Sequence, residues 1–154
     1  ILTSILLIFY WVKTNQLVNI YENLNTTNLF KTFGIISAFF LIIHSLLLGV
    51  KFEYDIYKFF RRFVLLGFII FEIVAQSLLV FKLYKIKLAL KDHFNNYVLI
   101  LKIILVSFLI IVALSTLPIV ISSGNTHFKH ALEWNYFVGV VLFYIFSRFF
   151  WKKL

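Results

Sequence analysis

Long runs of apolar residues alternate with short charged stretches along the chain. Four runs are dominated by Leu, Ile, Val and Phe, and they cover residues 33–50, 62–84, 97–121 and 132–150. A hydrocarbon core of roughly 30 Å needs about 20 apolar residues in a helix, and only helices or closed barrels satisfy their backbone polar groups there. The pattern therefore predicts four clear membrane-spanning helices.

The first twelve residues are also apolar, but as a helix they extend only about 18 Å, which is too short to cross a bilayer. The helix either continues through Leu17 and Ile20, with Lys13 reaching towards the membrane surface, or is the tail of a longer helix. We expect a partial fifth span over about residues 1–20. The predicted fold class is all-α, a polytopic transmembrane helix bundle that forms a single membrane domain over residues 1–154.

The composition agrees with a membrane protein. The chain is 62% hydrophobic and has 20 Phe but one Pro, and a soluble globule of 154 residues could not bury so much apolar surface. Cysteine is absent, which excludes disulfides and thiolate metal sites. Methionine is absent even at position 1, so we expect an N-terminal segment that was processed away or is missing from the sequence.

The positive charges predict the orientation of the spans. If the spans alternate in direction, nine Lys and Arg residues share one side and five share the other. Because the side richer in Lys and Arg is usually cytoplasmic, we expect the C-terminus on the cytoplasmic or equivalent side. The charges do not decide between an endomembrane and an organelle inner membrane. The nine are Lys13, Lys31, Lys82, Lys85, Lys87, Lys91, Arg148, Lys152 and Lys153, and the five are Lys51, Lys58, Arg61, Arg62 and Lys129.

The net charge of +9 raises the alternative of nucleic-acid binding. The basic residues lie in short loops or beside aromatic residues at the ends of spans, which is typical of contacts with lipid headgroups. We therefore expect membrane lipids and other membrane subunits as partners, and no nucleic acid. The predicted headgroup contacts are Lys85, Lys87, Arg148, Lys152 and Lys153.

Three polar side chains are expected at membrane depth. His44 lies about 16 Å into its span and Glu72 about 15 Å into the next span from the opposite side, so both arrive near the midplane. The two could pair, with Gln76 one turn from Glu72 extending the network. Such a network acts as interhelical glue, as a site for a polar ligand or headgroup, or as a proton relay. Lys102 lies nearer a span end and is expected to reach the membrane surface.

Cofactor and enzyme signatures are weak. Haem held between two histidines needs both at one depth, and only His44 is deep. His127, His130 and Glu133 follow at i, i+3 and i+6, but the His-Glu-x-x-His zinc signature is absent, so interfacial hydrogen bonding is the preferred interpretation. No nucleophile elbow or phosphate loop is present. We expect no cofactor, no metal and no catalytic residue, and a non-enzymatic function is favoured over an enzymatic one.

The last two spans resemble a known family. The similarity lies in four short segments that precede an aromatic helix: residues 113–117 (Ala-Leu-Ser-Thr-Leu), residues 122–125 (Ser-Ser-Gly-Asn), His127 or His130, and residues 131–134 (Ala-Leu-Glu-Trp). With these segments the chain resembles the Frag1/DRAM/Sfk1 family of multispan membrane proteins. A weaker similarity covers residues 49–53 and then Gly67 and Phe71, with Glu53 where the family usually has Gln. The motif residues carried over are Ser123, Gly124, Asn125, His127, His130, Glu133 and Trp134.

The resemblance implies six spans in the complete family pattern, a cytoplasmic C-terminus, and roles in autophagy, in recruitment of phosphoinositide kinases or in lipid handling. It implies no catalytic residue. Apart from any family, Glu133 suits the positive end of a helix dipole and Trp134 suits the headgroup region, so both also have a structural explanation.

Three functions are compatible with the sequence. The leading hypothesis is a non-enzymatic integral membrane protein that organises partners or lipids. The alternative is a small hydrophobic subunit of a larger membrane complex such as a respiratory assembly, because the loops are short and the helices are apolar all round. The third is an intramembrane enzyme or carrier that uses buried His and Glu residues.

Overall fold

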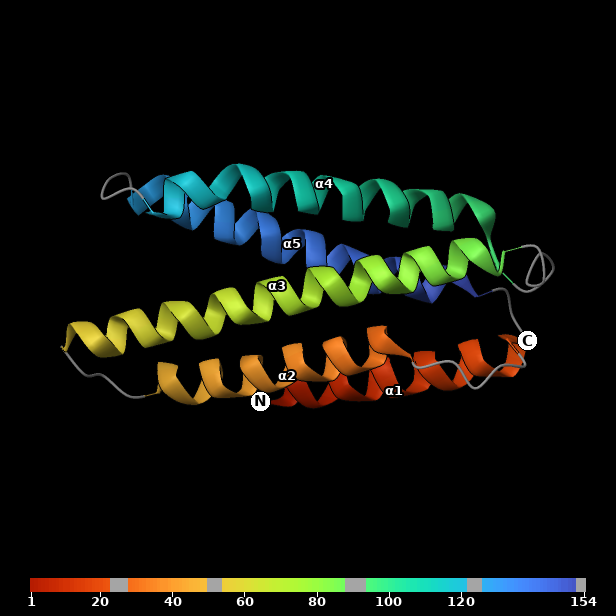
Figure 1. The fold of residues 1–154 in the computed structure, drawn as a ribbon, viewed down its shortest axis with the longest axis horizontal. Helices are drawn as coiled ribbons and strands as arrows, with labels where there is room; N and C mark the ends of the chain where they lie inside the picture. The colour runs from red at the N-terminus through yellow and green to blue at the C-terminus, as the bar shows by residue number, and fades with distance from the viewer. Residues whose placement is uncertain (23–27, 50–53, 88–93, 122–125, 152–154) are drawn as a thin grey trace. The chain divides into compact units, whose positions relative to one another are not determined.

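The computed structural model is helical throughout the ranges that it describes (Figure 1), which are residues 1–22, 28–49, 54–87, 94–121 and 126–151. For residues 21–22, 55, 58, 116–121 and 126–133 only the backbone is described. These ranges contain no strand, although a single β-bridge joins Phe94 to Trp151. The all-α prediction is confirmed. The helices are α1 (Leu2–Glu22), α2 (Leu29–Leu48), α3 (Asp55–Lys85), α4 (Asn96–Ile121) and α5 (Thr126–Phe150).

Three helices are long and apolar enough to cross a membrane, and they indicate a membrane protein. The candidate spans are Leu29–Leu48 in α2, Phe59–Lys85 in α3 and Asn96–Ser115 in α4. The structure therefore gives three candidate spans where four clear spans were predicted. In α5 the described apolar part is the shorter segment Trp134–Phe150, since the side chains of residues 126–133 are not described.

The first helix runs further than its apolar beginning. It continues without a break through Leu17 and Ile20 to Glu22, as one of the two alternatives for this segment requires. It is not among the three candidate spans, because Lys13, Thr14, Asn15 and Gln16 interrupt its apolar character.

The chain forms two compact units, residues 1–82 and residues 83–154. The first contains α1, α2 and most of α3, and the second contains α4 and α5. The single membrane domain expected from the sequence stays a prediction.

In the first unit, α1 and α2 pack along each other. Residues of α1 at alternating spacings of three and four are buried, which places them on one face of the helix. At the centre of this face the indole of Trp11 lies flat on Gly34 of α2, and a Cβ atom at Gly34 would be 2.3 Å from the ring. Small residues permit this close approach of helices. The buried residues of the α1 face are Ser4, Leu7, Trp11, Thr14 and Val18.

The third helix packs antiparallel to α2 through aromatic side chains. The ring of Phe71 is stacked on those of Phe33 and Phe40, with centroid distances of 5.9 and 5.4 Å. Phe40 also lies over Gly67, where a Cβ atom would be 2.6 Å from its ring. At one end of the unit Lys82 donates a hydrogen bond to Asn28, which in turn donates to Asn19 at 2.7 Å. These polar side chains therefore connect the end of α1, the beginning of α2 and the end of α3.

In the second unit, α4 and α5 run antiparallel. The backbone N–H of Asn95, just before α4, donates to the carbonyl of Phe150 at the end of α5, at 2.9 Å. Beside this bond the rings of Phe94 and Phe150 are stacked at 5.1 Å between centroids. Further along the pair, Leu109 of α4 packs on Gly139 of α5.

Candidate functional site

A polar cluster is buried between α2 and α3 in the first unit. Glu72 and Gln76 of α3 and Ser37 of α2 are all 0% exposed. The Gln76 Nε2 donates to Glu72 Oε1 at 2.9 Å, and the Ser37 Oγ lies 2.6 Å from Glu72 Oε2. The same Ser37 Oγ lies 2.8 Å from the carbonyl oxygen of Gly34. The predicted neighbourhood of Glu72 and Gln76 is therefore present, with Ser37 as the contact on the facing helix.

Aromatic residues enclose this cluster. Trp11 covers Gly34, whose carbonyl oxygen belongs to the cluster, and the fully buried ring of Phe30 lies 6.3 Å from the indole between centroids. On α3, Phe71 precedes Glu72 and is held between two Phe rings of α2. The Glu72 side chain is 0% exposed, so water is excluded from the carboxyl group and each of its hydrogen bonds is stronger than it would be in a solvated site.

His44 lies at a different level from Glu72. The hydrogen bond between Asn28 and Lys82 defines a common end, from which Ser37 is nine residues away and Glu72 ten. His44 is sixteen residues from Asn28, which places it about 10 Å further along the unit than Ser37. The imidazole is half-buried. Its pairing with Glu72 stays a prediction that this register does not favour.

The second unit contains a buried lysine. Lys102 of α4 is 1% exposed, and its Nζ donates to the Ser147 Oγ of α5 at 2.6 Å. The ammonium group also lies over the rings of Phe143 and Phe150, at 4.2 and 5.4 Å from their centroids. Desolvated cation–π contacts of this kind contribute about 2 kcal/mol. The expectation that Lys102 reaches the membrane surface is wrong, because α5 supplies a hydroxyl acceptor and two aromatic faces next to it.

The predicted headgroup contacts lie on the surface where they are described. Lys85 and Arg148 are exposed, and Arg148 lies in the last turn of α5. Lys87 is half-buried, with its Nζ 4.3 Å from the centroid of the Tyr84 ring. Lys152 and Lys153 lie outside the described residues. Contact of these residues with lipid stays a prediction.

The side chains of most residues of the Frag1/DRAM/Sfk1-like motif are not described. Ser123, Gly124 and Asn125 lie outside the described residues, and His127, His130 and Glu133 are placed on α5 by their backbone alone. Trp134 is described, is 70% exposed and makes an edge contact with Phe137 at 6.3 Å between centroids. Within the described side chains, no three His, Asp or Glu come together in a way that would hold a metal ion. The structure therefore does not test the metal hypothesis for residues 127–133.

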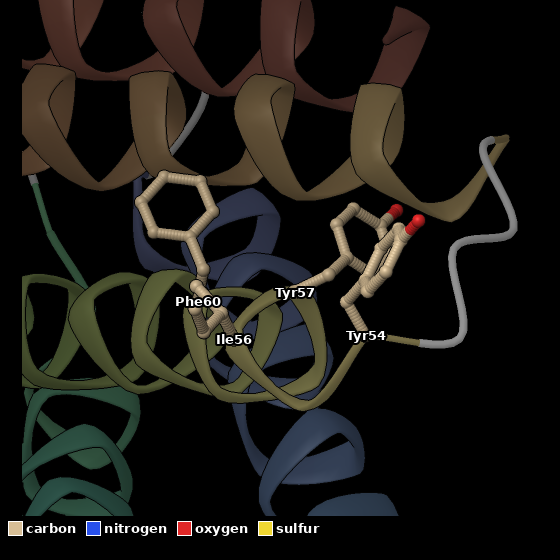
Figure 2. A pocket seen from close by; sticks show the side chains of 4 residues that line it. All are labelled: Tyr54, Ile56, Tyr57 and Phe60. Atoms are coloured by element: carbon tan, nitrogen blue, oxygen red, sulfur yellow. The ribbon is translucent and has the colours of Figure 1, made fainter.

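An open apolar groove lies where α3 begins (Figure 2). It has a volume of about 440 Å³ and is lined by Tyr54, Ile56, Tyr57 and Phe60. Tyr57 and Phe60 project from α3 to the side on which α2 lies, and the Tyr57 hydroxyl donates to the carbonyl of Leu47 near the end of α2. This hydrogen bond fixes Tyr57 and with it one wall of the groove. The hydropathy pattern did not predict this groove, although aromatic residues beside a span end are a signal for an interfacial site.

Comparisons with family models, with curated proteins and with solved structures gave no significant match to this chain. The resemblance to the Frag1/DRAM/Sfk1 family therefore stays a prediction from the residues quoted for it.

Proposed function

We propose that this chain is a non-enzymatic integral membrane protein that organises lipids around it, and that an anionic phospholipid occupies the groove at the beginning of α3. The observation that carries the proposal is the groove of Tyr54, Ile56, Tyr57 and Phe60, which is directly followed by Arg61 and Arg62.

The outer surface of the helices supports a location in the membrane. On α4 the side chains facing away from α5 are as apolar as those that pack against it, which is the pattern of a helix surrounded by hydrocarbon. The exposed apolar residues of α4 include Ile100, Leu101, Ile104, Phe108, Ile111 and Leu114.

The position of the groove supports a lipid as the occupant. The candidate span of α3 begins at Phe59, so the groove lies at the edge of the apolar segment, where Tyr is enriched in membrane proteins. Side chains on a helix lean towards its N-terminus, so Arg61 and Arg62 lean back over the turn that carries Tyr57. Both arginines are exposed. An acyl chain in the groove would place its phosphate within reach of two guanidinium groups, which bind phosphate with paired hydrogen bonds.

Native mass spectrometry of the chain in detergent tests this proposal. The purified chain is mixed with phosphatidylglycerol or phosphatidylcholine, and retained lipid is measured for the parent and for the double variant Arg61→Gln, Arg62→Gln. We expect retention of phosphatidylglycerol over phosphatidylcholine by the parent and about tenfold less retention by the variant, which corresponds to about 1.4 kcal/mol. The charge-matched control is Lys13→Gln with Lys31→Gln, which lies on α1 and α2 away from the groove.

Equal retention of both lipids, or an equal loss in the control variant, would show that the groove is not a site for anionic lipid. An additional Tyr57→Ala variant, which removes one wall of the groove, is expected to weaken binding of both lipids.

A subunit of a larger membrane assembly is the second candidate. It is favoured by a broad exposed apolar face on α5, which can pack against another helix. The face consists of Trp134, Phe137, Val138, Val141, Leu142, Ile145 and Phe149. Extraction from the native membrane followed by sizing separates the candidates: stoichiometric co-migration with other subunits supports the assembly, and an isolated 18.2 kDa chain supports the first proposal.

The finer topology belongs to the same proposal. We propose that α5 also crosses the membrane and that the C-terminus lies on the cytoplasmic side. Support comes from α5 running antiparallel to the candidate span in α4 and from the excess of Lys and Arg on that side of the chain.

A further inference from the structure

We infer that Glu72 is a proton-binding site inside the membrane, where the neutral carboxylic acid donates a hydrogen bond to Ser37. This inference does not depend on lipid binding at the groove. It rests on the number of hydrogens available in the cluster formed by Gly34, Ser37, Glu72 and Gln76.

The Ser37 hydroxyl has one hydrogen but two oxygen neighbours. Its Oγ lies 2.8 Å from the Gly34 carbonyl oxygen and 2.6 Å from Glu72 Oε2. A carbonyl oxygen only accepts, and an ionised carboxylate only accepts, so an ionised Glu72 would leave one of these two short contacts without a hydrogen. A proton on Glu72 Oε2 supplies the missing hydrogen: Glu72 then donates to Ser37, and Ser37 donates to Gly34.

Gln76 points to the same shortage of hydrogens. Its amide N–H₂ group donates to Glu72 Oε1, while its own Oε1 is buried and has no donor within the part of the chain that the structure describes. Around Ser37 and Gln76 there are thus more acceptor oxygens than hydrogens to share among them. Adding one proton to the carboxyl group reduces this excess, whereas an ionised carboxylate increases it.

The location of Glu72 also favours the neutral carboxylic acid. The side chain is 0% exposed and lies well inside the candidate span Phe59–Lys85, thirteen residues or about 20 Å from Lys85. An ionised carboxylate in such a position loses its hydration, and a buried acid commonly becomes neutral instead. Proton binding at Glu72 is an equilibrium in which the carboxylate takes one proton from water and returns it to water on release.

The other charged or titratable side chains near this level are few among the described residues. On α2, His44 lies about 10 Å beyond Ser37, and the half-buried Lys31 lies about 9 Å on the other side. On α1, Lys13 is exposed and Tyr10 is half-buried. On α3 itself, Arg62 and Lys82 are each ten residues or about 15 Å from Glu72. Glu72 is the acid of this cluster.

Infrared spectroscopy of the purified full chain in a detergent without carbonyl groups tests the inference, because the C=O stretch of a protonated carboxyl is separate from the bands of a carboxylate. We expect a protonated-carboxyl band at neutral pH that is missing in Glu72→Gln. In Ser37→Ala the band is expected to persist but to shift, because the O–H group loses its acceptor. The matched control, Asp55→Asn at the first residue of the same helix, is expected to keep the band unchanged.

Two results would overturn the inference. One is a Glu72→Gln spectrum that loses carboxylate intensity relative to the parent while its protonated-carboxyl region is unchanged, which would show that Glu72 is ionised. The other is a protonated-carboxyl band that appears only when sodium is replaced by choline, which would assign the site to a metal cation in place of a proton. Should Glu72→Gln fail to accumulate, the shift in Ser37→Ala decides between the two protonation states by itself.

Discussion

The close contact between Trp11 and Gly34 makes the packing of α1 on α2 directly testable by Gly34→Ala. A Cβ atom at this position would lie 2.3, 2.4 and 2.5 Å from three atoms of the indole ring, whereas carbon atoms in contact are normally about 3.5–4.0 Å apart. The helices or the ring must therefore move by about 1 Å. Trp11 is fully buried and contacts Phe30, so the ring cannot turn into open space.

Two effects of this substitution oppose each other. Replacing Gly by Ala inside a helix stabilises it by about 1 kcal/mol, while forcing an extra methyl group into a packed interface costs about 1–3 kcal/mol. Because the obstacle is a rigid buried ring, we expect overpacking to dominate and the free energy of unfolding to fall by about 1–2 kcal/mol. When Trp11 is Ala, the obstacle is gone and Gly34→Ala should raise the free energy of unfolding by about 1 kcal/mol.

The assay is equilibrium unfolding in mixed micelles with an increasing fraction of SDS, followed by far-ultraviolet circular dichroism. The four chains of the double-mutant cycle are compared, and the expected coupling is about 2–3 kcal/mol. Gly49→Ala is the control, since Gly49 has helical φ and ψ angles and only the Leu46 carbonyl oxygen, at 3.5 Å, would meet its Cβ atom. An equal effect of Gly34→Ala in both Trp11 backgrounds would refute the packing described for α1 and α2.

Three further predictions concern other parts of the chain. Lys102→Met should leave the free energy of unfolding unchanged or raise it, whereas Ser147→Ala should lower it by about 1–3 kcal/mol, since loss of the acceptor leaves a buried ammonium group with fewer contacts. SDS titration measures both variants. A larger loss of stability in Lys102→Met than in Ser147→Ala would contradict this account. Because the chain has no cysteine, the single variants Lys85→Cys and Arg62→Cys can each be labelled with an impermeant maleimide. We expect the two cysteines to react from opposite sides of the membrane. Labelling of both from the same side would contradict the span in α3. Asn28→Ala should lower the free energy of unfolding by about 1–3 kcal/mol in the same titration, because it removes the hydrogen bonds of Asn28 to α1 and α3. A loss below about 0.3 kcal/mol would show that these hydrogen bonds do not hold the helices together.

The sequence predicted the helices well, because apolar runs of this length have few alternatives. The runs around residues 33–50, 62–84 and 97–121 coincide with candidate spans in α2, α3 and α4. The boundaries were less accurate, since α2 begins at Leu29 and α3 at Asp55. In both cases polar or aromatic residues join the first turns of a helix, and hydropathy alone gives no reason to include them.

The partner of Glu72 shows why the site was only partly predictable. Its neighbour Gln76 follows from the helical repeat, which needs no knowledge of other helices. Its contact on α2 depends on the register between two helices, and this contact is with Ser37, which lies seven residues before His44. Both helices begin before the apolar runs, α2 by four residues and α3 by seven, and errors of this size in the boundaries are enough to change the expected partner.

The sequence alone determined that the chain is helical, that its apolar segments suit a membrane, and that an acid lies within one of them. These properties follow from local composition and from the rise of a helix. The tertiary structure decided which side chains meet: Ser37 with Glu72, Trp11 with Gly34, and Lys102 with Ser147. Those contacts depend on how helices face one another, and helices that are apolar all round carry no signal in their sequence for the direction in which they pack.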